Sequence, residues 1–157
     1  MPFDPSTFME QTIDEPLSSQ RLLCPEGEHP MTVGEFNFDD KTFRNITRKD
    51  GSEAVILRLP FVIQDPKVNE ELGRDQVIVY FRDIWLDFKP GTSELDTGKG
   101  KNADLGAIRK ALGLEGGNVF ASMRGAGPVL GMVRHRGIDE NDPERKIAEV
   151  VRVAPMS

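Results

Sequence analysis

The chain has 157 residues, enough for one hydrophobic core and too few for two ordinary domains joined by a linker. Its composition, 38% hydrophobic and 29% charged, is typical of a globular protein and argues against a disordered or fibrous chain. Its net charge of −6 argues against binding of duplex DNA through charge over the whole surface, so any nucleic-acid site has to be a local basic patch.

The sequence contains no stretch approaching the roughly 20 apolar residues of a membrane span. Residues 1–10 also lack the basic flank and apolar core of a signal peptide, so we expect a cytoplasmic protein, in the host cytoplasm if the chain is viral. Cys24 is the only cysteine, which excludes an internal disulfide and a cysteine-based zinc site. We therefore expect its thiol to be buried or inert.

The N-terminal residues 1–24 show neither a helical nor a two-residue apolar period. We interpret them as an arm that packs irregularly or binds a neighbour, ahead of one domain over residues 25–157. Pro25 to Pro30 is typical of a turn, and Met31 to Phe38 is typical of a strand with a bulge near Gly34.

The next segments predict a hairpin and a long strand. Residues 43–47 and 53–63 flank an Asp-Gly pair, which favours a tight turn with positive φ at Gly51. After one short helical turn over residues 68–73, the apolar run over residues 77–88 predicts the longest strand of the chain.

The C-terminal half begins with residues 89–103, which are rich in glycine and lysine and predict a mobile loop. A helix is predicted over Leu105 to Leu112, with Asp104 as its N-cap and Gly113 at its end. Strands are then expected over residues 119–123, 129–134 and 146–153, the last one after a polar turn.

The order of three strands, one helix and two strands predicts a mainly β protein. It matches a five-stranded Greek-key barrel of the OB type with the helix between strands three and four. Five curved strands would close the sheet and leave no exposed edge.

Four segments also resemble bacteriophage single-stranded-DNA-binding proteins of the OB type. They are Pro25-Glu26-Gly27-Glu28, Leu57 to Asp65, Leu105 to Leu114 and Lys146 to Val153, so the likeness covers about residues 25–153. The resemblance implies an OB barrel that binds and protects single-stranded DNA during phage replication or recombination, in contact with other phage replication or recombination proteins. We expect no cofactor and no metal.

Binding of single strands without sequence preference needs cations for phosphates and aromatic faces for bases, and Tyr80, Arg82 and Trp85 supply both within six residues. On a regular strand Tyr80 and Arg82 share one face, while Phe81 and Trp85 share the other with Asp83. We therefore favour the Tyr80 and Arg82 face for the ligand and place Phe81 in the core. Core packing with a hydrogen-bonded polar tip is the alternative for Tyr80 and Trp85.

Other cations recur near the ends of predicted strands and in the long loop. The remaining candidate binding residues are Arg44, Arg48, Lys49, Arg58, Lys99, Lys101, Arg134, His135 and Arg136. Arg58 interrupts an apolar strand and has to face solvent, an acid or a ligand, because a buried unpaired guanidinium is costly. For Arg134, His135 and Arg136 a solvated strand end is the alternative, and for Lys99 and Lys101 a plain soluble linker is the alternative. Phe36, Phe38 and Phe61 are expected in the core.

No nucleophile or metal-ligand spacing is recognisable, so we expect a non-catalytic protein. The first alternative function is a structural phage protein, either a capsid-decorating or an assembly module, because a fold does not fix a function. The second is an acidic protein that imitates DNA, motivated by the excess of Asp and Glu. A homo-oligomer is compatible with each of these functions.

Overall fold

The computed structural model describes residues 3–51 and 53–156, and the elements below refer to this part of the chain. The strands are β1 (Gly27–Val33), β2 (Phe43–Thr47), β3 (Glu53–Leu57), β4 (Pro60–Ile63), β5 (Ile78–Phe81), β6 (Ile84–Leu86), β7 (Val129–Gly137) and β8 (Lys146–Pro155). The helices are α1 (Pro5–Met9), α2 (Pro66–Leu72) and α3 (Ala103–Ala111), with a 3-10 helix η1 (Ala121–Met123). Among these residues no helix is both long and apolar enough to cross a membrane.

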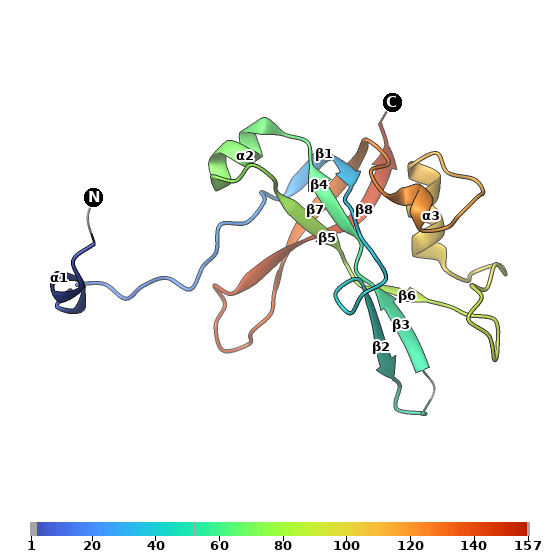
Figure 1. Cartoon of the computed structure of the whole chain (residues 1–157), viewed down its shortest axis with the longest axis horizontal. Coiled ribbons are helices and arrows are strands. Elements are labelled where there is room, and N and C mark those ends of the chain that lie inside the picture. Colours follow the sequence, from blue (N-terminus) through green and yellow to red (C-terminus); the bar gives the residue numbers. More distant parts are fainter. Residues whose placement is uncertain (1–2, 52, 157) are drawn as a thin grey trace.

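Five strands close into a barrel in the order β1-β4-β5-β8-β7 (Figure 1). β5 and β8 run parallel, and the other neighbours run antiparallel. The prediction of a mainly β chain with a five-stranded closed barrel is confirmed, and the strand order is that of an OB-type barrel. In chain order α3 follows the third barrel strand, β5, and precedes the fourth, β7; it contacts β8 and β6.

The three other strands form a second sheet in the order β2-β3-β6. The predicted hairpin is present as β2 and β3, and Gly51 in its turn has a φ of +86°. Ser52, the last residue of the expected turn, lies outside the described residues. Figure 1 shows this hairpin projecting below the barrel.

Two long predicted strands are in fact divided between the barrel and the second sheet. The run over residues 53–63 breaks at Arg58 and Leu59 into β3 and β4, and the run over residues 77–88 breaks at Arg82 and Asp83 into β5 and β6. β4 pairs with β5 in the barrel, while β3 pairs with β6 in the second sheet. The two runs therefore bend together. Apolar residues continue on both sides of each break, so periodicity does not reveal the bend.

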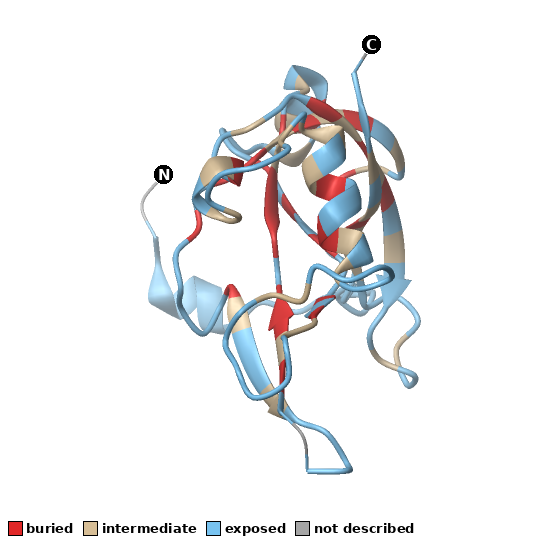
Figure 2. Cartoon of the chain, turned by 90° about the vertical axis from the view of Figure 1, so that its right-hand side faces the viewer, coloured by how far each residue is buried: buried red, intermediate tan, exposed pale blue. Residues whose placement is uncertain are grey.

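The core is formed by the inward side chains of the barrel strands and by one face of α3. Phe61 and Phe81, whose ring centroids lie 6.4 Å apart, are buried beside Met31. Leu105 and Ile108 add the apolar face predicted for the helix. Figure 2 shows buried residues along the barrel strands and one side of α3, while the arm and the loops are exposed. Full burial of each large apolar side chain stabilises the fold by about 1.5–3 kcal/mol.

Local hydrogen bonding overrides several predictions. Gly27 to Pro30 belongs to β1 and not to a turn; Pro30 lacks an N–H, but its carbonyl accepts a bond from Gln64 N at 2.8 Å. The expected strand over residues 119–123 contains η1 instead, because the Asn118 side chain accepts bonds from the next turn's backbone N–H groups. The N-cap of α3 is Asn102, and Asp104 lies in the first turn.

The segment after β1 also differs from expectation. The strand ends at Val33 without continuing through the predicted bulge to Phe38. Phe36 is buried as predicted, but the prediction of a core position for Phe38 is wrong, since this side chain is 86% exposed. In contrast, the short helix after β4 is present as α2, capped by Asp65 and ended by Gly73 with a φ of +64°.

The described residues 3–22 of the arm are exposed, and the chain becomes buried at Cys24, the last residue of the arm. Its one regular element is α1, where Asp4 accepts a bond from Ser6 N at 3.0 Å and Pro5 occupies the first turn. Ser18 and Ser19 donate to Glu144 Oε2 at 3.2 Å and thereby fix the end of the arm to the β7–β8 loop. Met1 and Pro2 lie outside the described residues.

Candidate nucleic-acid interface

A groove of about 440 Å³ runs over the outer surface of β5 and β8, beside the segment that leads from the arm into β1. The basic side chains that line it are Arg21, Arg44, Arg58, Arg74, Arg136 and Lys146. Two carboxylates, Asp83 and Glu149, line it as well, so six positive and two negative groups leave a local charge of +4. We call this surface the basic groove. In a protein of net charge −6 it is a local concentration of positive charge.

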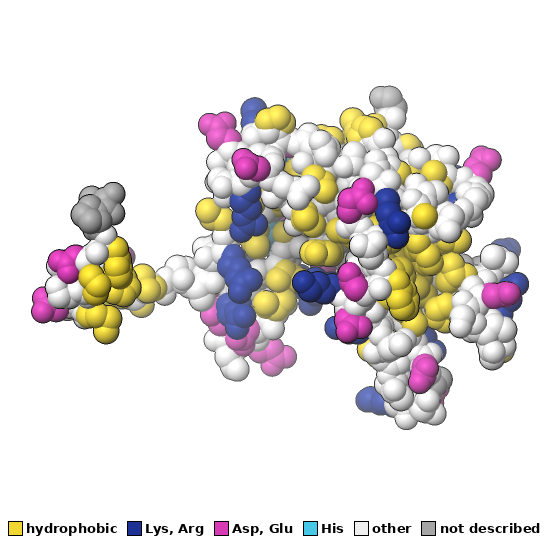
Figure 3. All heavy atoms as spheres, in the orientation of Figure 1, with side chains coloured by type: hydrophobic (Ala, Val, Ile, Leu, Met, Phe, Trp, Pro, Cys, Tyr) yellow, Lys and Arg dark blue, Asp and Glu magenta, His cyan; other side chains and the backbone are white. Residues whose placement is uncertain are grey.

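Two of the basic side chains are paired with the groove's carboxylates. Arg136 Nε donates to Glu149 Oε1 at 3.0 Å, and Arg44 Nη2 lies 3.7 Å from Asp83 Oδ2. Within residues 3–51 and 53–156, no ion pair joins a carboxylate to any of the other four, which are Arg21, Arg58, Arg74 and Lys146. Figure 3 shows Lys and Arg side chains in a band on the side of the barrel nearest the arm. The four cations are available to an anionic ligand.

Tyr80 lies at the floor of the basic groove and is 38% exposed, so it does not occupy the core position that was its alternative. The Arg58 guanidinium lies 4.6 Å from its ring centroid, within the range of a cation–π contact. Arg58 is exposed, as its charge required. The two residues combine an aromatic face with a positive charge at one point of the groove.

Trp85 is exposed next to the groove without lining it. Because the run breaks at Arg82 and Asp83, the face assignment for one regular strand does not apply, and Tyr80 and Trp85 are both exposed. Strand register places Ile56 opposite both Trp85 and Arg44, so these three residues share one face of the second sheet. The Arg48 guanidinium lies 5.8 Å from the indole centroid. Arg44 thus connects the Trp85 face to the basic groove.

The predicted cluster at the end of β7, Arg134 to Arg136, does not form one surface. Arg136 lines the groove, and register places Arg134 opposite Glu149, which itself lies opposite Tyr80. His135 instead faces the start of the domain: its Nε2 lies 2.7 Å from the Cys24 carbonyl oxygen, and its backbone N–H donates to Glu26 Oε2 at 3.0 Å. His135 is therefore engaged in holding this segment against β7.

Arg82, which was expected to share a ligand face with Tyr80, turns away from the groove. Its Nη2 donates to Asp104 Oδ1 at 3.3 Å in the first turn of α3, and its Nε donates to the Val151 carbonyl oxygen at the same distance. The side chain thus connects β5, β8 and α3. Arg82 lies at the break between β5 and β6, so its side chain does not follow the alternation between the two faces of a strand.

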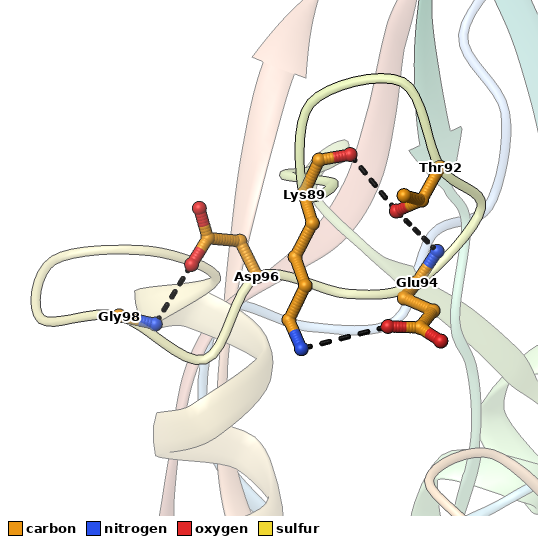
Figure 4. Close-up of polar contacts among 5 residues, drawn as sticks. All are labelled: Lys89, Thr92, Glu94, Asp96 and Gly98. Carbon is orange, nitrogen blue, oxygen red and sulfur yellow. Dashed lines mark hydrogen bonds and ion pairs between the residues drawn. The ribbon is translucent and has the colours of Figure 1, made fainter.

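The loop between β6 and α3 is held by its own polar contacts (Figure 4). Thr92 Oγ1 donates to the Lys89 carbonyl, Glu94 N donates to Thr92 Oγ1, and Lys89 Nζ pairs with Glu94 at 3.5 Å. Asn102 then closes the loop by bonding the backbone of Asp87 and Asp96 at 2.8–2.9 Å. The expected absence of regular structure is correct, apart from one bridge between Phe88 and Leu95.

The loop lysines do not reach the basic groove. Lys101, like Arg48, lines a second and larger hollow on the opposite face of the second sheet, while Lys49 and Lys99 are exposed and line neither hollow. The groove residues that sequence reasoning missed are Arg21, Arg74 and Lys146. Lys146 begins the fifth barrel strand, beside a loop that OB barrels use for ligands, and this position could have identified it. The sequence carries no comparable signal for Arg21 and Arg74, which the fold brings together.

Neither the described residues nor similarity to known proteins indicates another kind of site. No group of three or more metal-ligating side chains occurs in the described residues. Asp and Glu side chains are scattered over the face shown in Figure 3, which gives no support to a DNA-imitating surface there. No protein-family model matches the chain, and no curated protein or solved structure is significantly similar to it.

Proposed function

We propose that the chain binds and protects single-stranded DNA, without catalysing a reaction, through the basic groove. The observation that carries this proposal is the local charge of +4 around the half-exposed ring of Tyr80, in a protein that is otherwise acidic. Phage replication or recombination is the setting that the sequence resemblance implies.

The position of the groove on the barrel supports the same function. OB barrels bind oligonucleotides on the face of their second and third strands, between the loops that join strands one to two and four to five. Here Tyr80 lies on the third barrel strand, and Arg58 lies two residues before the start of the second. Arg44 belongs to the hairpin between strands one and two, while Arg136 and Lys146 flank the loop between strands four and five.

The chemistry favours a single strand without sequence preference. Phosphates attract the unpaired guanidinium and ammonium groups, and an unstacked base finds the Tyr80 ring, which can stack on any base. A duplex keeps its bases stacked, so it would contact the positive side chains of the groove but not stack a base on Tyr80. Arg136 and Arg44 are held in place by Glu149 and Asp83, which positions them before the strand arrives.

Fluorescence anisotropy with a labelled oligothymidine at low salt tests this proposal. The groove variant is Arg58→Gln, Arg74→Gln and Lys146→Gln combined, which removes three cations that form no ion pair with a carboxylate among the described residues. Its matched control is Lys41→Gln, Lys67→Gln and Lys110→Gln, which removes three exposed cations outside both hollows. Loss of three phosphate contacts should weaken binding at least tenfold and reduce the salt dependence of affinity.

The control variant should bind within about twofold of the unmodified chain at moderate salt, where charges beyond a Debye length are screened. Absence of oligothymidine binding by the unmodified chain would remove the proposed function. Equal losses in both triple variants would show that binding follows net charge and not the groove.

A further inference from the structure

The second hollow, of about 1140 Å³, lies between the β2-β3-β6 sheet, the loop after β6 and the segment around η1. Its aromatic lining residues are Phe36, Phe38, Phe43, Phe88 and Phe120. Phe43 contacts Phe38 and Phe120 at centroid distances of 5.1 and 5.2 Å, while Phe38 leaves 86% of its surface in solvent. Figure 3 shows hydrophobic side chains at the surface between the hairpin and this loop. We call this surface the aromatic groove.

The rim of the aromatic groove is basic. Arg48, Lys89, Lys101 and Arg124 line it, against the two carboxylates of Glu53 and Asp87. Within the described residues, Lys89 alone among these cations forms an ion pair, with Glu94. A ligand that fits this surface needs large apolar side chains together with negative charge.

The arm has this composition. Phe3, Phe8, Met9, Ile13 and Leu17 are between 52% and 85% exposed, and the rings of Phe3 and Phe8 contact each other at a centroid distance of 5.1 Å with a tilt of 55°. Residues 3–20 contain four carboxylates and neither lysine nor arginine. Figure 3 shows the end of the arm as a hydrophobic surface bordered by acidic side chains. Burial of such an apolar segment is favourable, and exposed apolar side chains gathered in one place are typical of an interaction surface.

We propose that the arm of one copy of the protein occupies the aromatic groove of a second copy. The aromatic and aliphatic side chains of residues 3–17 would cover Phe38 and its neighbours, and Glu10, Asp14 and Glu15 would meet the basic rim. Figure 1 shows the arm leaving the barrel on the side away from the second sheet and the loop after β6, which favours a groove on another molecule. Between α1 and the contact of Ser18 with Glu144, residues 11–17 can span up to about 25 Å when extended, so α1 can reach a neighbour.

Sedimentation velocity of the full chain over a range of concentrations tests this inference. The unmodified chain should self-associate, and association should weaken at high salt because the contact is partly electrostatic. Phe3→Ser with Phe8→Ser removes the arm's aromatic pair, and Phe38→Ser removes the exposed ring of the groove. All three side chains are mostly exposed, so both variants should fold. Each variant alone should be monomeric, and Met156→Ser, which removes an exposed apolar side chain outside both hollows, should associate normally.

Mixing the two variants distinguishes exchange between molecules from docking within one. The arm variant keeps an intact groove and the groove variant keeps an intact arm, so the mixture should recover a dimer. A monomeric unmodified chain, or a mixture that stays monomeric, would overturn the proposal. It would also be overturned if Phe38→Ser lost oligothymidine affinity with unchanged self-association, because the groove would then belong to DNA. The self-association does not depend on the basic groove, so it can fail or succeed separately from the proposed function.

Discussion

Arg58 interrupts an apolar run where the chain passes from the second sheet into the barrel. Its charge alone predicts exposure, because no apolar strand can bury an unpaired guanidinium cheaply. Its contact with Tyr80 could not be predicted in the same way, since it depends on the pairing of β4 with β5. At the residue scale, therefore, sequence chemistry identifies which side chains face solvent but not which of them meet.

Replacement of Tyr80 by alanine should weaken oligothymidine binding by roughly 5- to 150-fold, corresponding to the ~1–3 kcal/mol of one stacked base. Tyr80→Phe keeps the ring and should bind within about twofold of the unmodified chain. Fluorescence anisotropy titrations of the three proteins measure the difference. Equal affinities would show that Tyr80 does not contact a base.

The Cys24 thiol should react slowly in the folded protein. Burial, followed by the nearby Asp65 carboxylate, raises its pKa to about 11 from the 9.0 of an exposed thiol. The folded state thus holds about 100-fold less thiolate at pH 8 than the unfolded state. A thiol-specific reagent such as Ellman's reagent should react at least that much more slowly before than after addition of guanidinium, whereas equal rates would contradict the buried position.

The raised pKa of Cys24 also determines how stability changes with pH. Between about pH 9 and 11 the unfolded chain loses the thiol proton while the folded chain retains it. The contribution of the Cys24 thiol to the free energy of unfolding is therefore complete below pH 9 and is lost as the pH rises toward 11. Denaturant titrations should show a smaller loss of stability over this pH range in Cys24→Ser.

At the scale of elements, the barrel strands, the hairpin, α2 and the apolar face of α3 could be predicted, because each carries its own periodicity or turn chemistry. The bends between β3 and β4 and between β5 and β6 could not. Apolar residues run through both breaks, and only the two sheets decide where each run changes partner. η1 was missed because a single Asn118 side chain outweighs the strand propensity of the residues after it.

The absence of a side chain at Gly131 in β7 makes room for the Met31 side chain of β1. A Cβ at this position would overlap the Sδ and Cε atoms of Met31, which is fully buried. Gly131→Ala should therefore lower the free energy of unfolding by about 1–3 kcal/mol. Gly137→Ala, in the same strand with open space around it, should change it by less than about 0.5 kcal/mol.

Urea denaturation measures both changes. Combining Gly131→Ala with Met31→Ala should cost less than the sum of the two single replacements, since the smaller side chain makes room for the new methyl group. If the losses of unfolding free energy were strictly additive, the new methyl group would not contact Met31.

The loop between β6 and α3 depends on Asn102, which adopts a φ of +53° and closes the loop through its side chain. Asn102→Ala removes these hydrogen bonds and places alanine in the left-handed region. Trypsin should then cleave after Lys99 or Lys101 several-fold faster than in the unmodified chain. Thr97→Ala, at an exposed position in the same loop, is the matched control and should leave the rate unchanged.

At the scale of the whole molecule, the fold gathers six basic side chains that lie between residues 21 and 146 in the sequence. The net charge predicts that a nucleic-acid site has to be local, and the cations on the hairpin and on strand ends are visible in the sequence. Arg21 lies in the arm and Arg74 follows a helix, so neither belongs to a pattern before the chain folds. The groove is a property of the tertiary structure.

Backbone amide chemical shifts of the full chain, recorded while oligothymidine is added, test the central claim most directly. Binding in the basic groove predicts the largest changes at Ile78 to Tyr80, at Arg58 and at Lys146 to Glu149. The amides around η1, in the aromatic groove, should then stay close to their original positions. Largest changes outside the basic groove, or unchanged spectra at an excess of oligothymidine, would contradict the account.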